Sequence, residues 1–67
     1  MHSYRCYVLD CRYRVAAIKL IECASDVEAR QRADALLAQM PAFCGVEVWQ
    51  RDRRVHINLL GVEQAAE

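Results

Sequence analysis

The sequence has little of what multidomain or membrane proteins need. It contains one proline, two glycines and no threonine, and no low-complexity stretch could serve as a linker. No run of apolar residues approaches the ~20 that span a bilayer, and the opening from Met1 to Arg5 lacks the apolar segment of a signal peptide. We therefore expect a single soluble, cytoplasmic domain over residues 1–60, followed by a loose tail at residues 61–67.

Net charge is also absent, because nine basic side chains balance nine acidic ones. No overall field would draw the chain to nucleic acid or to an anionic membrane, so we expect no membrane partner. The hydrophobic fraction is nevertheless 55%. A chain this short buries only about 60% of the surface that its unfolded form exposes. Self-association is the simplest way to cover the excess.

The sequence has four cysteines: Cys6, Cys11, Cys23 and Cys44. In a reducing cytosol they should be thiols rather than a disulfide framework. Cys6 and Cys11 lie at the loose limit of a metal-binding knuckle, but no second Cys or His pair follows at a matching interval. His2 and His56 could join them only by convergence in space. We predict no metal site and no cofactor.

Two strands are expected before the single helix. Tyr4 to Leu9 partly alternates, which places Arg5, Tyr7 and Leu9 on one face. A polar break at Asp10 to Arg12 precedes a second apolar run from Tyr13 to Ile21. Both sides of that run are apolar, so its period does not choose a core face, and a bulge near the turn would be compatible with it.

Ser25 to Glu28 matches a capping box, in which the Ser hydroxyl and the Glu carboxylate each accept from backbone amides of the first turn. Asp26 and Glu28 also lie at the positive end of the helix dipole. One apolar stripe follows: Ala29, Ala33, Leu36, Leu37 and Met40. Pro41 disfavours helical geometry at the residue before it and should end the helix.

Phe43 to Gln50 and Arg53 to Leu59 predict a β-hairpin whose two faces differ. Either Arg51 and Asp52 form a two-residue turn, or a four-residue loop runs from Gln50 to Arg53. The expected inner pairs are Val48 with Val55 and Val46 with Ile57; the expected outer pairs are Trp49 with Arg54 and Glu47 with His56.

The element order predicts an α+β domain, ββαββ, with a four-stranded antiparallel sheet in the order 2-1-3-4. This order gives the helix a right-handed crossover and makes every neighbouring pair antiparallel. One helix covers only one face of such a sheet. The other face is left for water or a partner.

Several segments carry a resemblance. They are a first strand ending Val-Leu-Asp10, a strand running into Ile-Glu-Cys-Ala24, the Ser-Asp-x-Glu-Ala29 helix start, and Gly-Val-Glu-Val-Trp-Gln50 followed by Arg-Arg-Val55. Together they resemble a group of short bacterial proteins with no assigned activity, which implies a ββαββ domain and no catalytic residue. The first forty residues also resemble HicB-type antitoxins, whose usual proline and glycine punctuation before the helix is missing here.

The open face carries the candidate site residues: Tyr7, Glu47, Trp49, Arg54 and His56. Leu9 should join them, with Val15 and Ile21 if the second strand turns that side outward. Aromatic and arginine side chains are enriched at protein interfaces, so we predict a non-enzymatic module that binds another protein or forms a homodimer.

Two other functions are weighed against association. Glu47 beside His56 could act as an acid or base, but on a flat sheet such a pair is more often a plain cross-strand contact. Arg5 and Tyr7 with Trp49 and Arg54 could instead bind single-stranded nucleic acid by stacking and phosphate contacts. Zero net charge and Glu47 on the same face argue against nucleic acid, which stays the alternative.

Overall fold

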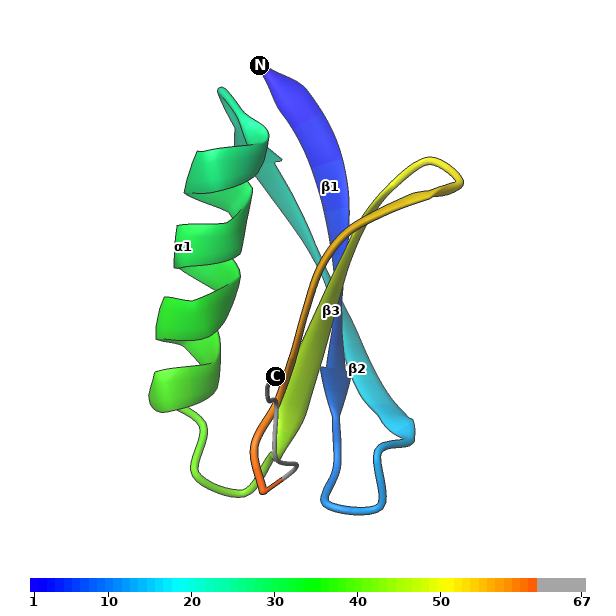
Figure 1. Ribbon diagram of the computed structural model, residues 1–67, viewed down its shortest axis with the longest axis vertical. Helices are drawn as coiled ribbons and strands as arrows, with labels where there is room; N and C mark the ends of the chain where they lie inside the picture. Colours follow the sequence, from blue (N-terminus) through cyan, green and yellow to red (C-terminus); the bar gives the residue numbers. More distant parts are fainter. Residues whose placement is uncertain (62–67) are drawn as a thin grey trace, which may run out of the picture.

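The computed structural model describes residues 1–61, so residues 62–67, most of the predicted tail, lie outside the described residues. The elements are β1 (His2–Leu9), β2 (Val15–Cys23), α1 (Asp26–Ala38), β3 (Gly45–Gln50) and β4 (Arg53–Leu59). All strand pairs are antiparallel, in the order β2-β1-β3-β4, and α1 lies on one side of the sheet (Figure 1). The predicted α+β fold and strand order are confirmed. Within residues 1–61, no helix has the length and apolar character to cross a bilayer.

Helix α1 begins where the capping box predicts. The Ser25 hydroxyl accepts from the Glu28 amide at 3.3 Å, and the Glu28 carboxylate accepts from the Ala24 amide at 2.9 Å. The helix ends at Ala38, before Pro41. Its buried residues are Ala29, Ala33 and Leu37, so the predicted apolar stripe faces the sheet.

The core lies between α1 and the sheet. The sheet contributes these fully buried side chains: Tyr4, Cys6, Val8, Cys23, Val46 and Val48. Ala29 and Ala33 are the helix residues opposite them, and their small side chains allow the helix to lie close to the strands.

Strand β2 turns Ile21 and Cys23 to the core and Ile18 and Leu20 to the other side of the sheet. The pairing with β1 shifts register between Val8 and Leu9, which leaves one extra residue on β2 near the turn. The extra residue forms a bulge near the turn, where the sequence allowed one. Packing against α1 determines which face of β2 lies in the core, a question that the apolar pattern of the sequence did not settle.

The hairpin register agrees with only part of the prediction. Trp49 does lie opposite Arg54, and Gln50 opposite Arg53, so Arg51 and Asp52 form a two-residue turn. Beyond Trp49 the register shifts by one, because β4 contains a bulge. The other predicted pairs are wrong. Val48 lies opposite His56, Glu47 opposite Ile57 and Val46 opposite Asn58.

A disulfide joins Cys11 to Cys44, whose Cα atoms are 4.8 Å apart, so the prediction of four thiols is wrong. The sheet brings the two residues together: Leu9 pairs with Gly45, and the Leu9 carbonyl accepts from the Cys44 amide at 2.9 Å. Their separation of 33 positions hid this proximity in the sequence. Cys6 and Cys23 are free and buried.

Candidate interaction surface on the open sheet face

The sheet face opposite α1, here called the open face, is built from rows of residues that lie directly opposite one another on neighbouring strands. Such residues point to the same side of a sheet. One row contains Leu20, Arg5, Trp49 and Arg54, and the next contains Ile18, Tyr7, Glu47 and Ile57. Four of the five predicted site residues, Tyr7, Glu47, Trp49 and Arg54, therefore share this face.

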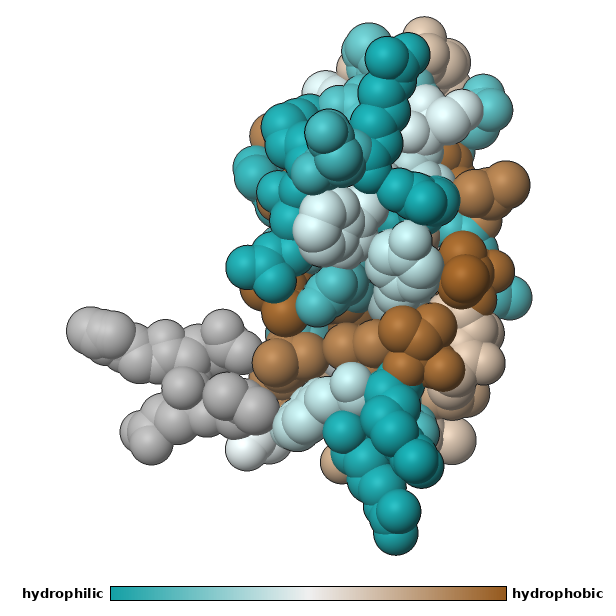
Figure 2. Space-filling view, turned by 90° about the vertical axis from the view of Figure 1, so that its right-hand side faces the viewer, coloured by the Kyte–Doolittle hydropathy of each residue, from teal (hydrophilic) through white to brown (hydrophobic). Residues whose placement is uncertain are grey.

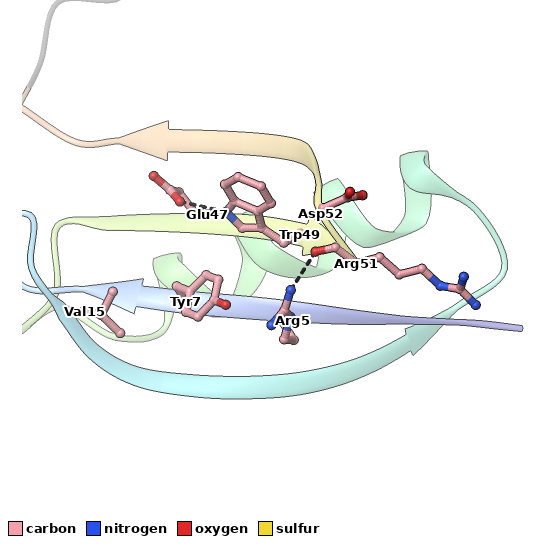
Figure 3. Close-up of a pocket in the computed structure, with 7 residues that line it drawn as sticks. All are labelled: Arg5, Tyr7, Val15, Glu47, Trp49, Arg51 and Asp52. Atoms are coloured by element: carbon pink, nitrogen blue, oxygen red, sulfur yellow. Dashed lines mark hydrogen bonds between the residues drawn. The ribbon is translucent and has the colours of Figure 1, made fainter.

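A shallow hollow of about 410 Å³ lies in the middle of the open face. Its lining consists of Arg5, Tyr7, Val15, Glu47, Trp49, Arg51 and Asp52. Figure 3 shows Arg5 and Tyr7 on β1 lying beside Glu47 and Trp49 on β3, with Arg51 and Asp52 at the turn. Strand pairing and one tight turn thus assemble these residues, including Val15, which β2 places opposite Leu9.

Glu47 is the polar centre of the hollow. Its carboxylate accepts from the Trp49 indole N–H at 2.8 Å, and the Arg54 guanidinium lies 3.9 Å from it. The indole is thereby fixed with its one donor already satisfied, and the charge of Glu47 has an opposite charge close by. Trp49 and Arg54, which lie directly opposite each other, thus share Glu47 as a partner.

Arg5 ties the hollow to the hairpin turn. One guanidinium nitrogen donates to the Arg51 carbonyl at 2.6 Å (Figure 3). The guanidinium carbon also lies 5.8 Å from the centre of the Tyr7 ring, within the range of a cation–π contact. Arg51 itself has φ of 58°, a left-handed conformation that non-glycine residues adopt rarely.

An apolar strip on β2 continues the hollow toward the edge of the sheet. It consists of Val15, Ile18 and Leu20, which are 56%, 58% and 76% exposed. Figure 2 looks onto this side of the molecule, where apolar side chains gather along the right edge and across the lower part while hydrophilic ones lie mainly at the top, on the left and at the bottom. The sequence prediction included Val15 but missed Ile18 and Leu20. It expected Ile21, which packs against the core instead.

His56 lies on the helix side of the sheet, because the β4 bulge reverses its direction. Its Nε2 is 2.9 Å from Asp34 of α1, and the Asn58 amide donates to the same carboxylate oxygen at 2.9 Å. Burial alone would raise the pKa of Asp34, but the hydrogen bonds from His56 and Asn58 outweigh it and lower that pKa. The predicted neighbourhood of Glu47 and His56 is wrong, and with it their use as an acid and base pair.

A second polar cluster was not predicted. Asp26, in the first turn of α1, accepts from the Tyr4 hydroxyl at 2.8 Å and from two nitrogens of Arg53 at 3.0 and 3.2 Å. The hydrogen bonds from Arg53, and next that from Tyr4, lower the pKa of Asp26. The three residues are too far apart in the sequence for any local pattern to connect them. The cluster fastens the helix start to the sheet.

Within residues 1–61, no group of three or more His, Cys, Asp or Glu side chains could hold a metal ion. Comparisons with protein-family models, curated proteins and solved structures find no match to this chain. The resemblances to short bacterial ββαββ proteins and to HicB-type antitoxins therefore stay predictions.

Proposed function

We propose that this protein is a non-enzymatic interaction module whose open face binds another protein surface, in the first place that of a second copy. The exposure of Val15, Ile18 and Leu20 beside the aromatic hollow is the observation that carries the proposal. A contiguous exposed apolar patch of this kind is typical of an interaction site.

The hollow has the chemistry of an interface centre. Tyr7 and Trp49 offer rigid aromatic area, and interface centres are enriched in such side chains and in arginine. The Trp49 N–H is already bonded to Glu47, so a partner could cover the indole without leaving a donor unpaired. Glu47 in turn has Arg54 beside it, which lowers the cost of removing its charge from water.

The same contacts argue against catalysis on this face. A general acid or base must have a titratable group within reach of a substrate proton. Glu47 is engaged by Trp49 and Arg54, and His56 is held by Asp34 on the opposite side of the sheet. We therefore keep the proposal to binding.

The test is the association of Trp49→Glu, measured by sedimentation equilibrium. The substitution removes the aromatic area of Trp49 and adds a charge that association must take out of water, so this variant should weaken face-to-face association at least about tenfold. Val27→Glu is the matched control, because Val27 is exposed on α1 and lies outside the open face. The proposal fails as self-association if the wild-type chain stays monomeric at high micromolar concentration. It fails equally if the two variants behave alike.

The alternative is a regulatory protein that binds nucleic acid through the same face. The observation that favours it is the presence of Arg5 and Arg51 around a hollow lined by two aromatic rings, a combination suited to stacking with phosphate contacts. Arg54→Ala should then weaken binding of a single-stranded oligonucleotide, and that binding should fall steeply with salt. Absence of binding at low salt would end this alternative.

A cytoplasmic location stays a prediction. The expectation of four free thiols followed from it, and the Cys11–Cys44 disulfide contradicts that expectation, because disulfides are rare in reducing compartments.

A further inference from the structure

We infer that the outer edge of β2 pairs with the same edge of a second copy, antiparallel and about a two-fold axis, so that one sheet runs through both chains. The inference goes beyond the proposed function and does not rest on it, because it uses backbone groups of β2 and not the aromatic hollow.

The two edges of the sheet are unlike. Strands β2 and β4 are the outer strands of the described sheet (Figure 1). β4 carries the exposed Arg53 and Arg54 and a bulge, which are features that protect an edge from pairing. β2 is nine residues long, is mainly apolar and has no proline. Its own bulge lies at its first end, between Val15 and Ala17, and its one basic residue is Lys19. The stretch of β2 from Ala17 to Ile21 is therefore the less protected of the two edges.

The direction of the β2 backbone follows from the bonds of its neighbours. The Leu9 carbonyl accepts from Cys44, so the odd-numbered residues of β1 turn their backbone groups toward β3. The even-numbered residues of β1 turn toward β2, where Cys6 lies opposite Lys19. Backbone groups of Lys19 therefore bond to β1, and those of its two neighbours point away from the sheet.

Those neighbours, Ile18 and Leu20, also have the exposed side chains of the apolar strip. Within residues 1–61 their outward amides and carbonyls have no strand opposite them. At the end of β2 the matching carbonyl, that of Glu22, accepts from the Arg32 guanidinium at 3.0 Å. The helix thus closes the last part of the edge and leaves the stretch around Ile18 and Leu20 available.

The Lys19 charge and the Arg32 contact limit the registers in which a second copy can pair. Two residues that lie opposite each other on antiparallel strands point to the same side of the sheet. When two identical strands pair about a two-fold axis, one residue must therefore lie opposite its own copy, and the axis passes through that residue. An axis at Lys19 would oppose two like charges, and an axis at Leu20 would require the Glu22 carbonyl that Arg32 occupies. An axis at Ile18 places Lys19 opposite Ala17 of the second copy and Ile18 opposite itself.

This arrangement enlarges the open face. A two-fold axis perpendicular to the sheet keeps both helices on one side and both open faces on the other. The strips of Val15, Ile18 and Leu20 from the two copies then meet at the centre of one continuous surface, with an aromatic hollow on each side. Two edge-paired dimers could pack with their open faces together, and that assembly would contain both the β2 edge contact and the face-to-face contact.

Leu20→Pro tests the edge by sedimentation equilibrium. Proline removes the outward amide and leaves the ladder between β2 and β1 intact, as edge strands tolerate. We expect it to weaken edge pairing at least about tenfold. Leu20→Ala is the matched control, because it removes the same exposed side chain from the open face and keeps the outward amide. Circular dichroism checks that each variant is folded.

The outcomes separate the two contacts. If the edge contact and the face-to-face contact both exist, Leu20→Pro should form only face-to-face dimers, and Trp49→Glu should form only edge-paired dimers. Association that Trp49→Glu abolishes and Leu20→Pro leaves unchanged overturns the edge inference and keeps the proposed function. Association that Leu20→Pro abolishes while Trp49→Glu and Leu20→Ala leave it unchanged keeps the edge and refutes face-to-face association. Equal weakening by Leu20→Pro and Leu20→Ala overturns the edge inference. A wild-type chain that never associates overturns the edge inference.

Hydrogen exchange of the wild-type chain gives a second test that needs no variant. The Lys19 amide should be protected at every concentration, because it bonds within the chain. The Ile18 and Leu20 amides should become protected only as concentration rises and dimers form. Fast exchange of Ile18 and Leu20 at concentrations where the chain is dimeric overturns the inference.

Discussion

At the scale of single residues, Asp26 makes the most consequential contacts in the described part of the fold. Its carboxylate accepts from Tyr4 of β1 and Arg53 of β4 while it sits in the first turn of α1. The sequence explains the presence of an acid there by the helix dipole. It does not reveal that the same acid connects three elements.

Asp26 should make stability depend on acid. Its pKa is lowered by the bonds from Arg53 and then Tyr4, and backbone amides of Arg14 and Arg12 lower the pKa of Asp10. A carboxyl with a lowered folded pKa stabilises the fold above its unfolded pKa of about 4, and this contribution is lost as pH falls further. The free energy of unfolding should therefore decrease below about pH 4.

Asp26→Asn should reduce that decrease, because the amide does not titrate. Urea unfolding followed at several pH values between about 7 and 3 measures the slope. Asp52→Asn, which removes one negative charge outside the cluster, is the control. A slope that is the same in Asp26→Asn as in the wild-type chain would contradict the role given to Asp26.

At the scale of elements, the hairpin shows what a period can and cannot determine. Alternation in β4 predicted Val55 and Ile57 inside and His56 outside. The bulge allows Val55 to pack against the core while His56 and Asn58 reach Asp34 of α1. A polar side chain can face the helix because a carboxylate there satisfies it. Hydrophobicity alone carries no information about such a partner.

The hairpin turn offers a test at this scale. Arg51 has φ of 58°, where a residue with a Cβ is disfavoured, and Asp52 is not in this region. Arg51→Gly should therefore be more stable than Asp52→Gly, by about 1–2 kcal/mol, because glycine relieves strain only at the first position. Urea unfolding of both variants gives the difference. Equal stabilities would show that the turn has another conformation in solution.

At the scale of the whole molecule, the disulfide links the segments that follow the end of β1 and precede the beginning of β3. Cys11 lies in the turn after β1, and Cys44 directly precedes β3. A chain of 67 residues has a small core, and a covalent link between distant segments supplements it. The Cys11–Cys44 bond and the exposed apolar surface are thus both explained by the small core of a short chain.

Breaking this bond should lower the free energy of unfolding by about 3–4 kcal/mol, the value for a closed loop of this length. Cys11→Ser and reduction of the wild-type chain should have the same effect, and reduction should not change Cys11→Ser further. Thiol titration of the denatured, unreduced chain should find only Cys6 and Cys23. Detection of all four thiols would contradict the disulfide.

The sequence by itself determined the helix bounds, the four strands, their order and most of the open face. Capping, proline and periodicity are local signals, and one helix between two hairpins leaves few topologies. Only the tertiary structure decided the core face of β2, the side of His56, the Asp26 cluster and the Cys11–Cys44 bond. Each of these depends on contacts between residues distant in the chain, which no local pattern encodes.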